Sequence, residues 1–141
     1  MSLVFWDTML FIYWFEDHPK YAGRVRTIFE RMEERQDTLV TSAFTVGEAL
    51  VAPYRKGDQR IVEGMRSMFR PPFVKVLPFT SETAARYAQI RAELKVSPAD
   101  AIQLACAAEA GVDLFLTNDH ALAGKRVPGI QFVAPMDVAL F

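Results

Sequence analysis

Short apolar runs alternate along the chain with longer segments whose apolar positions recur at helical spacing. The short runs have the length of strands buried in a parallel sheet, and they predict strands at residues 3–7, 38–41, 74–77, 113–117 and 130–133. The longer segments predict helices at residues 8–15, 19–35, 43–54, 58–69, 80–94 and 98–110. This alternation favours an α/β fold, a three-layer α/β/α domain with a central, mostly parallel sheet of four to five strands. The length fits a single domain over residues 1–141.

The clearest element signals belong to the last predicted helix and the strand after it. Ser97 is a good helix N-cap, and Pro98 fits the first helical position, where its missing N–H costs nothing. Asp100 then stands in the first turn, close to the positive end of the helix dipole. Gly111 ends this helix, and the apolar run 113–117 after it predicts a buried strand with a polar carboxyl end.

The two N-terminal helices are the most aromatic part of the chain. Residues 8–15 form either part of the core or a face for a partner, and the core is favoured. For the next helix we predict a start at Asp17-His18-Pro19, with Asp17 or His18 as the cap. Its apolar stripe at helical spacing consists of Tyr21, Val25, Ile28, Phe29 and Met32.

Composition excludes several classes of protein. About half of the residues, 51%, are apolar, which argues against disorder. The longest early apolar run, 3–15, is interrupted by Asp7 and Thr8, is too short to span a bilayer and lacks the positive start of a signal peptide. Cys106 is the single cysteine, so there is no disulfide framework, and we interpret it as a packing residue. We therefore expect a cytoplasmic protein without a membrane segment.

The net charge of −1 hides an asymmetry along the chain. Residues 20–75 carry a local charge of +4, and the remainder carries −5. A basic middle and acidic ends suit a protein that holds an anionic ligand beside an acidic centre. Solvated helix faces explain the same counts equally well.

Four acidic residues stand where apolar elements begin or end, or inside an otherwise apolar helix. Asp7 closes the first predicted strand and Asp119 closes the fourth, while Asp100 opens a helix and Glu48 lies within one. Because the carboxyl ends of parallel strands share one edge of a sheet, Asp7 and Asp119 should be neighbours if their strands pair. The helices that carry Glu48 and Asp100 would bring both side chains to the same edge.

Four carboxylates in one cleft repel one another, and the cluster makes physical sense if a hard divalent cation neutralises it. Mg²⁺ and Mn²⁺ prefer oxygen ligands and commonly bind through one or two carboxylates, waters and phosphate oxygens. Activation of water for hydrolysis would then be the chemistry.

Each acid also has a purely structural explanation. Asp7 could be a turn residue, and Glu48 could face solvent. Asp100 could be a capping acid, and Asp119 could cap the segment 120–123. The four matching positions together favour a site over these separate explanations.

At these positions the sequence resembles the PIN domain, and more closely the VapC-type toxins of bacterial and archaeal type II toxin–antitoxin pairs. The resemblance covers nearly the whole chain and rests on four motifs in order: Asp7-Thr8, Thr41-Ser42 with Thr45 and Glu48, Asp100-Ala101, and Thr117-Asn118-Asp119. It implies an endoribonuclease that depends on Mg²⁺ or Mn²⁺ and cuts RNA phosphodiesters. It also implies a cognate antitoxin, with the aromatic segments of the first two helices as a possible groove for it, and a homodimer.

Carried over residue by residue, the resemblance implies roles for seven positions. The metal ligands would be Asp7, Glu48, Asp100 and Asp119. Thr8 and Thr117 would line the site with hydroxyl groups that orient an acid or a water. Thr117 would also belong to the catalytic residues. Asn118 would line the site as a weaker member of the motif. The family often has a further acid and an aromatic after the last motif, where this chain has His120-Ala121-Leu122. This difference leaves a secondary carboxylate in doubt.

Two other functions are compatible with such a sheet. One is a non-catalytic PIN-like RNA-binding or scaffold module, against which the four acids argue. The other is a phosphatase or phosphotransfer domain with an aspartate nucleophile. Phosphatases of that kind need an acid two places after the first, where this chain has Met9, and a phosphoacceptor domain needs a late lysine, for which Lys125 is poorly placed. His120 could touch substrate or metal, but a hydrogen-bonding loop role is favoured.

Overall fold

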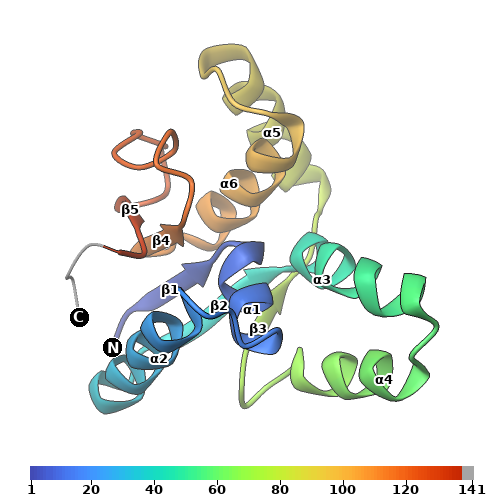
Figure 1. Ribbon diagram of the computed structural model, residues 1–141. Coiled ribbons are helices and arrows are strands. Elements are labelled where there is room, and N and C mark those ends of the chain that lie inside the picture. Colours follow the sequence, from blue (N-terminus) through green and yellow to red (C-terminus); the bar gives the residue numbers. More distant parts are fainter. Residues whose placement is uncertain (138–141) are drawn as a thin grey trace.

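The computed structural model describes residues 1–137, and within them five strands form one parallel sheet of order β3-β2-β1-β4-β5 (Figure 1). The strands are β1 Leu3–Trp6, β2 Thr38–Ser42, β3 Lys75–Leu77, β4 Leu114–Thr117 and β5 Phe132–Pro135. The helices are α1 Thr8–Phe15, α2 Ala22–Arg35, α3 Ala43–Lys56, α4 Gln59–Met68, α5 Ser81–Glu93 and α6 Pro98–Ala110. The order of elements and the parallel sheet confirm the predicted α/β fold.

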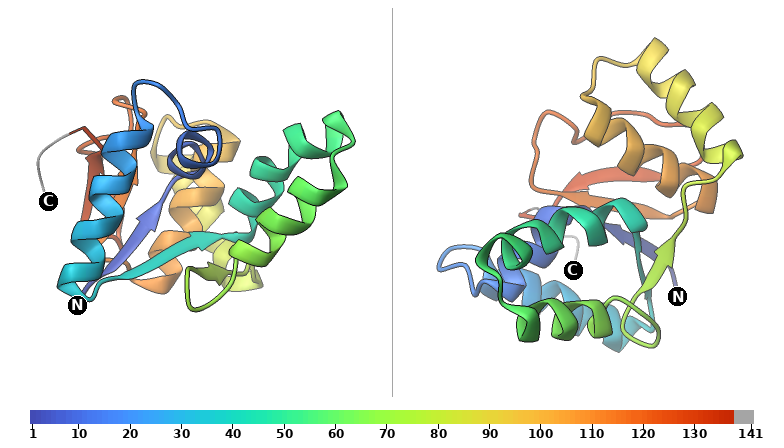
Figure 2. Two further views of the ribbon diagram at one scale, coloured as in Figure 1. Left: turned by 60° about the horizontal axis from the view of Figure 1, so that its bottom comes forward. Right: turned by 90° about the vertical axis from the view of Figure 1, so that its right-hand side faces the viewer.

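Helices cover both faces of the sheet because successive strand residues point to opposite sides. On β1, Val4 and Trp6 join one buried cluster with side chains of α1, α2, α3 and α4. Phe5 belongs to the second cluster, with α5 and α6, where its ring stacks on Phe115 at 4.9 Å between centroids. The helices α3 and α4 lie side by side as a hairpin that extends away from the sheet (Figure 2).

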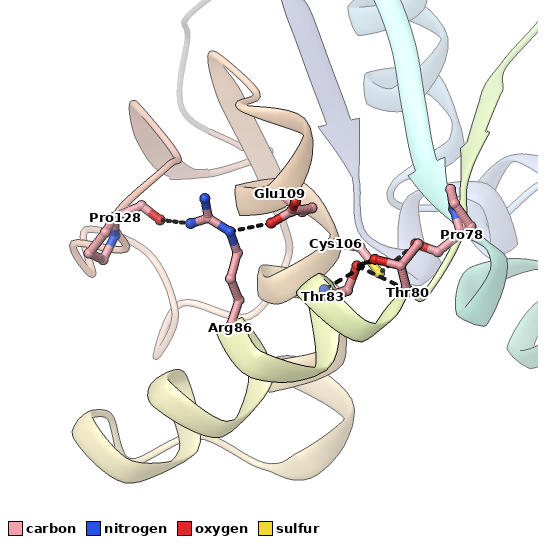
Figure 3. A network of polar contacts seen from close by, with 7 residues as sticks. All are labelled: Pro78, Thr80, Thr83, Arg86, Cys106, Glu109 and Pro128. Atoms are coloured by element: carbon pink, nitrogen blue, oxygen red, sulfur yellow. Dashed lines mark hydrogen bonds and ion pairs between the residues drawn. The ribbon is translucent and has the colours of Figure 1, made fainter.

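Specific contacts fix α5 against α6 (Figure 3). Arg86 of α5 forms an ion pair with Glu109 of α6 and donates to the carbonyl oxygen of Pro128 at 3.4 Å. Gly129 follows with φ +98°, and a Cβ at this position would stand 2.7 Å from the carbonyl oxygen of Ala108. The loop after β4 can therefore approach α6 this closely only with glycine there.

The aromatic segment 8–15 belongs mainly to the core, as predicted. Leu10 and Phe11 are fully buried and Tyr13 nearly so. The apolar stripe of α2 is also confirmed as buried at Val25 and Ile28, which pack in the core cluster on one face of the sheet. None of the helices within residues 1–137 is long and apolar enough to cross a membrane.

The predicted start of the second helix was wrong. α2 begins at Ala22 with Tyr21 as its N-cap residue, so Asp17-His18-Pro19 precedes it. Asp17 has a left-handed backbone, with φ +49°, and its N–H donates to the carbonyl oxygen of Trp14 at the end of α1. The Nδ1 atom of His18 then accepts the N–H groups of the two residues that lead into α2. These polar residues form the turn between two helices because α1 ends just before them.

The last strand also lies two residues later than predicted. β5 begins at Phe132, which pairs with Leu114, and Ile130 belongs to the turn before it. The other elements agree with their predicted positions within about two residues. α3 continues past residue 54 to Lys56 through Pro53, and Gly57 then ends it with φ +68°.

Candidate active site

A cleft of about 410 Å³ opens at the carboxyl edge of the sheet, and all four acids line it. Asp7 follows β1 and Asp119 follows β4, which is the hydrogen-bonded neighbour of β1. Asp100 lies in the first turn of α6, and Glu48 lies on α3. The structure therefore brings together the acidic residues that the sequence singled out, and Thr8, Thr117 and Asn118 line the same cleft. Their roles in catalysis stay predictions.

Asp7 stands at the centre of the hydrogen bonds in this cleft. Its side chain caps α1 by accepting the N–H of Thr8 at 2.9 Å, so the structural explanation for this residue also holds. Its other carboxylate oxygen accepts the hydroxyl of Thr117 at 2.9 Å. Burial raises the pKa of Asp7, and the charges of Asp100 and Glu48 raise it further, while the two hydrogen bonds oppose these effects.

Glu48 is half-buried and points toward the cleft because of a local cap. Ser42 ends β2 and caps α3, where its hydroxyl oxygen accepts the N–H of Thr45 at 3.0 Å. Glu48 follows one turn later on the same face of α3. Its Oε1 atom accepts the hydroxyl of Thr8 at 2.6 Å. This bond rules out the solvent-facing alternative for Glu48.

Asp100 and Asp119 form the more open side of the cleft. The hydroxyl of Ser97 caps α6 and accepts the N–H of Asp100 at 3.1 Å. Burial raises the pKa of Asp100, and the charge of Asp119 adds to this effect. Asp119 is exposed, and its carboxylate accepts the N–H of Ala121 at 2.9 Å, as expected for a residue that caps the next turn.

Asn118 and Thr117 connect this side of the cleft to its floor. Thr117 is fully buried, and its hydroxyl oxygen accepts the N–H of Asp119 at 3.0 Å. The amide of Asn118 donates to the hydroxyl of Tyr13 on α1 at 2.8 Å. The residues after β4 are therefore tied to α1 and to β1 by side-chain hydrogen bonds.

Sequence reasoning missed Gln103 and gave Thr45 and Ser42 no role in the cleft. Gln103 lines the cleft from α6 and is 2% exposed. It is the one residue with a polar side chain in the buried run 101–108, and it follows Asp100 by three positions, which places both on one face of the helix. This three-residue spacing from Asp100 is the sequence signal that could have identified Gln103 as a residue of the cleft.

Two other candidates lie outside the cleft. The Nε2 atom of His120 stands 3.3 Å from a carboxylate oxygen of Asp137, and the residue does not line the cleft within the described chain. This agrees with the favoured role in a loop. Cys106 is a buried residue of α6, and burial raises the pKa of its thiol to about 11, as expected for a packing residue.

The donor atoms of the cleft suit a hard divalent cation. The described residues contain no group of three histidine, cysteine, aspartate or glutamate side chains close enough to enclose a metal ion by themselves. The cleft instead offers carboxylates from four segments, near enough for their charges to raise the pKa values of Asp7 and Asp100. This arrangement fits Mg²⁺ or Mn²⁺, which need one or two carboxylates and complete their shell with water or phosphate oxygens.

Comparisons with known proteins agree with this architecture. A chain of VapBC2 from Rickettsia felis, in a complex with promoter DNA, superimposes with a TM-score of 0.74 at 15% identity, over 94% of this chain and 98% of that one. A chain of DNA-bound VapBC from Salmonella typhimurium gives 0.64 at 26% identity, over 96% and 99%. The VapC20 toxin of Mycobacterium tuberculosis, described as cleaving the sarcin–ricin loop, gives 0.65 at 17% identity, over 87% and 96%. A comparison with curated protein sequences found no match.

A family model gives the assignment directly. The model of the PIN domain matches residues 4–127, a range that includes every residue that lines the cleft. Because this match spans most of the sequence, and the fold is that of VapC toxin structures, the chain belongs to the PIN domain family.

Proposed function

We propose that this protein is an endoribonuclease that depends on Mg²⁺ or Mn²⁺ and acts as the toxin of a toxin–antitoxin pair. The observation that carries the proposal is the convergence of Asp7, Glu48, Asp100 and Asp119 on one cleft of a PIN domain. The four come from segments far apart in the sequence, and their like charges raise the pKa values of Asp7 and Asp100. A bound divalent cation would relieve this repulsion.

The four carboxylates are the residues that would hold the cation. When bound, Mg²⁺ or Mn²⁺ supplies activation of water and neutralises charge on the phosphate. The chain's own residues keep the ligands in place for this chemistry. Thr117 holds one oxygen of Asp7, and Thr8 holds Oε1 of Glu48, so that the second oxygen of Glu48 stays available.

Antitoxin binding is supported by a second, apolar groove beside the cleft. This groove of about 540 Å³ lies between α1, α3 and α4 and shares Ile12 and Glu48 with the acidic cleft. Phe15, Ile61 and Met65 are among its lining residues. An antitoxin segment lying in it would reach the acids of the cleft directly. A homodimer and a cytoplasmic location remain part of this proposal.

Cleavage of RNA tests the proposal. The wild-type protein should cut a mixture of structured and unstructured RNAs when Mn²⁺ is added. Cleavage should stop when a chelator is added. The Asp7→Asn and Asp100→Asn variants should keep the circular dichroism spectrum of the wild type and lose cleavage. If both variants cut at the wild-type rate, the assignment is wrong. RNA binding by the wild type without any cleavage would favour a non-catalytic module.

A further inference from the structure

Gln103 connects more segments of the cleft than any predicted site residue does. From inside α6 its amide reaches Asp7 and Thr8 at the start of α1, Thr45 at the start of α3, and Ser42 at the end of β2. It is almost completely buried, so it has no water to replace a lost partner. A fully bonded amide in such a position fixes the orientation of the groups it touches.

The contacts of Gln103 with Ser42 and Asp7 together determine which end of the amide faces the cleft. The oxygen of the Ser42 hydroxyl already accepts the N–H of Thr45, so its proton is free to be donated to Oε1 of Gln103. The NH₂ group of Gln103 therefore points into the cleft. The opposite orientation would place the amide oxygen 3.4 Å from a carboxylate oxygen of Asp7 and leave both without a proton between them.

The NH₂ group in turn sets the direction of two hydroxyl groups. It donates to Thr45 Oγ1 at 2.7 Å and to Thr8 Oγ1 at 2.9 Å. Thr8 gives its proton to Glu48, so the 3.1 Å contact between the two threonines must use the proton of Thr45. The protons thus point in one direction, from Gln103 through Thr45 and Thr8 to Glu48.

We propose that Gln103 is a positioning residue of this cleft, whose amide holds the Thr45 and Thr8 hydroxyls so that Thr8 donates to Glu48. The inference rests on the proposed function, because its consequence is a cleft preorganised for a divalent cation. Without the amide, the hydroxyls of Thr45 and Thr8 lose the donor that orients them, and the bond from Thr8 to Oε1 of Glu48 is no longer fixed. Outer partners of this kind typically change metal affinity by about 10–100-fold when they are removed.

The test measures Mn²⁺ binding in the absence of RNA. Gln103→Met keeps the length of the side chain and removes its hydrogen-bonding groups. Titration followed by electron paramagnetic resonance of free Mn²⁺ should show a Kd about tenfold higher than that of the wild type. With saturating Mn²⁺, kcat for RNA should fall by about tenfold while KM for RNA stays within about twofold.

Two further variants separate positioning from a general loss of stability. Leu104→Ala on the same helix creates a cavity in the core cluster that contains Phe5. It should lower the melting temperature without changing the Kd for Mn²⁺. Thr45→Val keeps the volume of the side chain and removes the hydroxyl between Gln103 and Thr8. It should raise the Kd on its own, and in combination with Gln103→Met it should add little, because both changes act on Thr8.

The outcomes distinguish this inference from the proposed function. If the wild type binds Mn²⁺ and cuts RNA, and Gln103→Met does both equally well, the inference is wrong and the proposed function stands. The same holds if the effects of Gln103→Met and Thr45→Val are fully additive, or if Leu104→Ala weakens Mn²⁺ binding as much as Gln103→Met. A wild type that neither binds Mn²⁺ nor cuts RNA would overturn the proposed function and the inference together.

Discussion

The hydroxyl of Thr117 donates to Oδ2 of Asp7 at 2.9 Å and so joins the carboxyl ends of two neighbouring strands, β4 and β1. This bond favours the charged form of a buried carboxylate and lowers its pKa against the effect of burial. Thr117 is itself fully buried, so water cannot take over its role. The geometry of the most central acid thus depends on a side chain that need not touch the substrate.

Replacing Thr117 by valine should weaken RNA cleavage by about tenfold, because Asp7 loses the partner that orients it. Thr41→Val is the matched control. Thr41 is a buried threonine of β2 whose hydroxyl donates to the backbone oxygen of Trp6 at 2.9 Å and not to a cleft residue. Steady-state cleavage rates of both variants with Mn²⁺ check this prediction. Equal rates for Thr117→Val and Thr41→Val would show that the bond to Asp7 is unimportant.

The Asp7→Asn variant should be more stable than the wild type at neutral pH when no metal is present. The pKa of Asp7 is raised from 3.8 in the folded protein, mainly by burial, so the folded state binds its proton more tightly than the unfolded chain does. The contribution of Asp7 to the free energy of unfolding therefore falls as the pH rises from about 3.8 through the raised pKa. Asparagine does not ionise, so the Asp7→Asn variant does not lose this part of the free energy of unfolding.

Urea unfolding in the presence of a chelator, repeated across this pH range, measures the effect. The free energy of unfolding should decline less steeply with pH for Asp7→Asn than for the wild type. Part of the decline with pH should remain in Asp7→Asn, because the pKa of Asp100 is also raised. Parallel curves for the two proteins would contradict the role of burial at Asp7.

Divalent metal should stabilise the wild type through the same cleft. A ligand that binds only the folded state at about 100 times its Kd adds about 2.7 kcal/mol to the free energy of unfolding. We expect Mn²⁺ to raise the melting temperature of the wild type and to have little effect on Asp100→Asn. Differential scanning calorimetry with and without Mn²⁺ measures both shifts, with Asp58→Asn, at the exposed cap of α4, as a control that responds like the wild type.

Gly129→Ala should destabilise the protein more than Gly124→Ala does. Both glycines have a positive φ, +98° and +80°, so alanine at either position costs about 1–2 kcal/mol of backbone strain. A Cβ on residue 129 would also meet the carbonyl oxygen of Ala108 at 2.7 Å, whereas nothing lies within 4 Å at residue 124. The additional clash should cost a further ~1 kcal/mol or more. Equal unfolding free energies for the two variants would argue against the close approach of this loop to α6.

The fold and the acidic cleft follow largely from local signals. The strand that ends at Asp7 and the strand before Asp119 are short apolar runs with polar ends, and their pairing brings the two acids together. Ser97 caps α6 as predicted and Ser42 caps α3, and these caps set the positions of Asp100 and Glu48. The start of α2 was not predictable in this way, because the left-handed backbone of Asp17 depends on how α1 ends.

The hydrogen-bond network around Gln103 could not be derived from the sequence. A glutamine in a helix is a common, weakly informative residue, and its importance comes from the packing of α6 against the starts of α1 and α3. In the sequence, Thr45 and Ser42 look like ordinary residues at the start of a helix, although their hydroxyls form hydrogen bonds with Gln103. Tertiary contacts between segments about 60 residues or more apart in the sequence decide these roles.

Anomalous diffraction from crystals grown with Mn²⁺ tests the central claim most directly. The claim predicts a strong anomalous peak in the cleft, bound to oxygens of at least two of the four carboxylates of Asp7, Glu48, Asp100 and Asp119. Crystals of Asp100→Asn grown in the same way should show a weaker peak or none. A cleft without any peak at saturating Mn²⁺, or a peak on another face of the molecule, would contradict the claim.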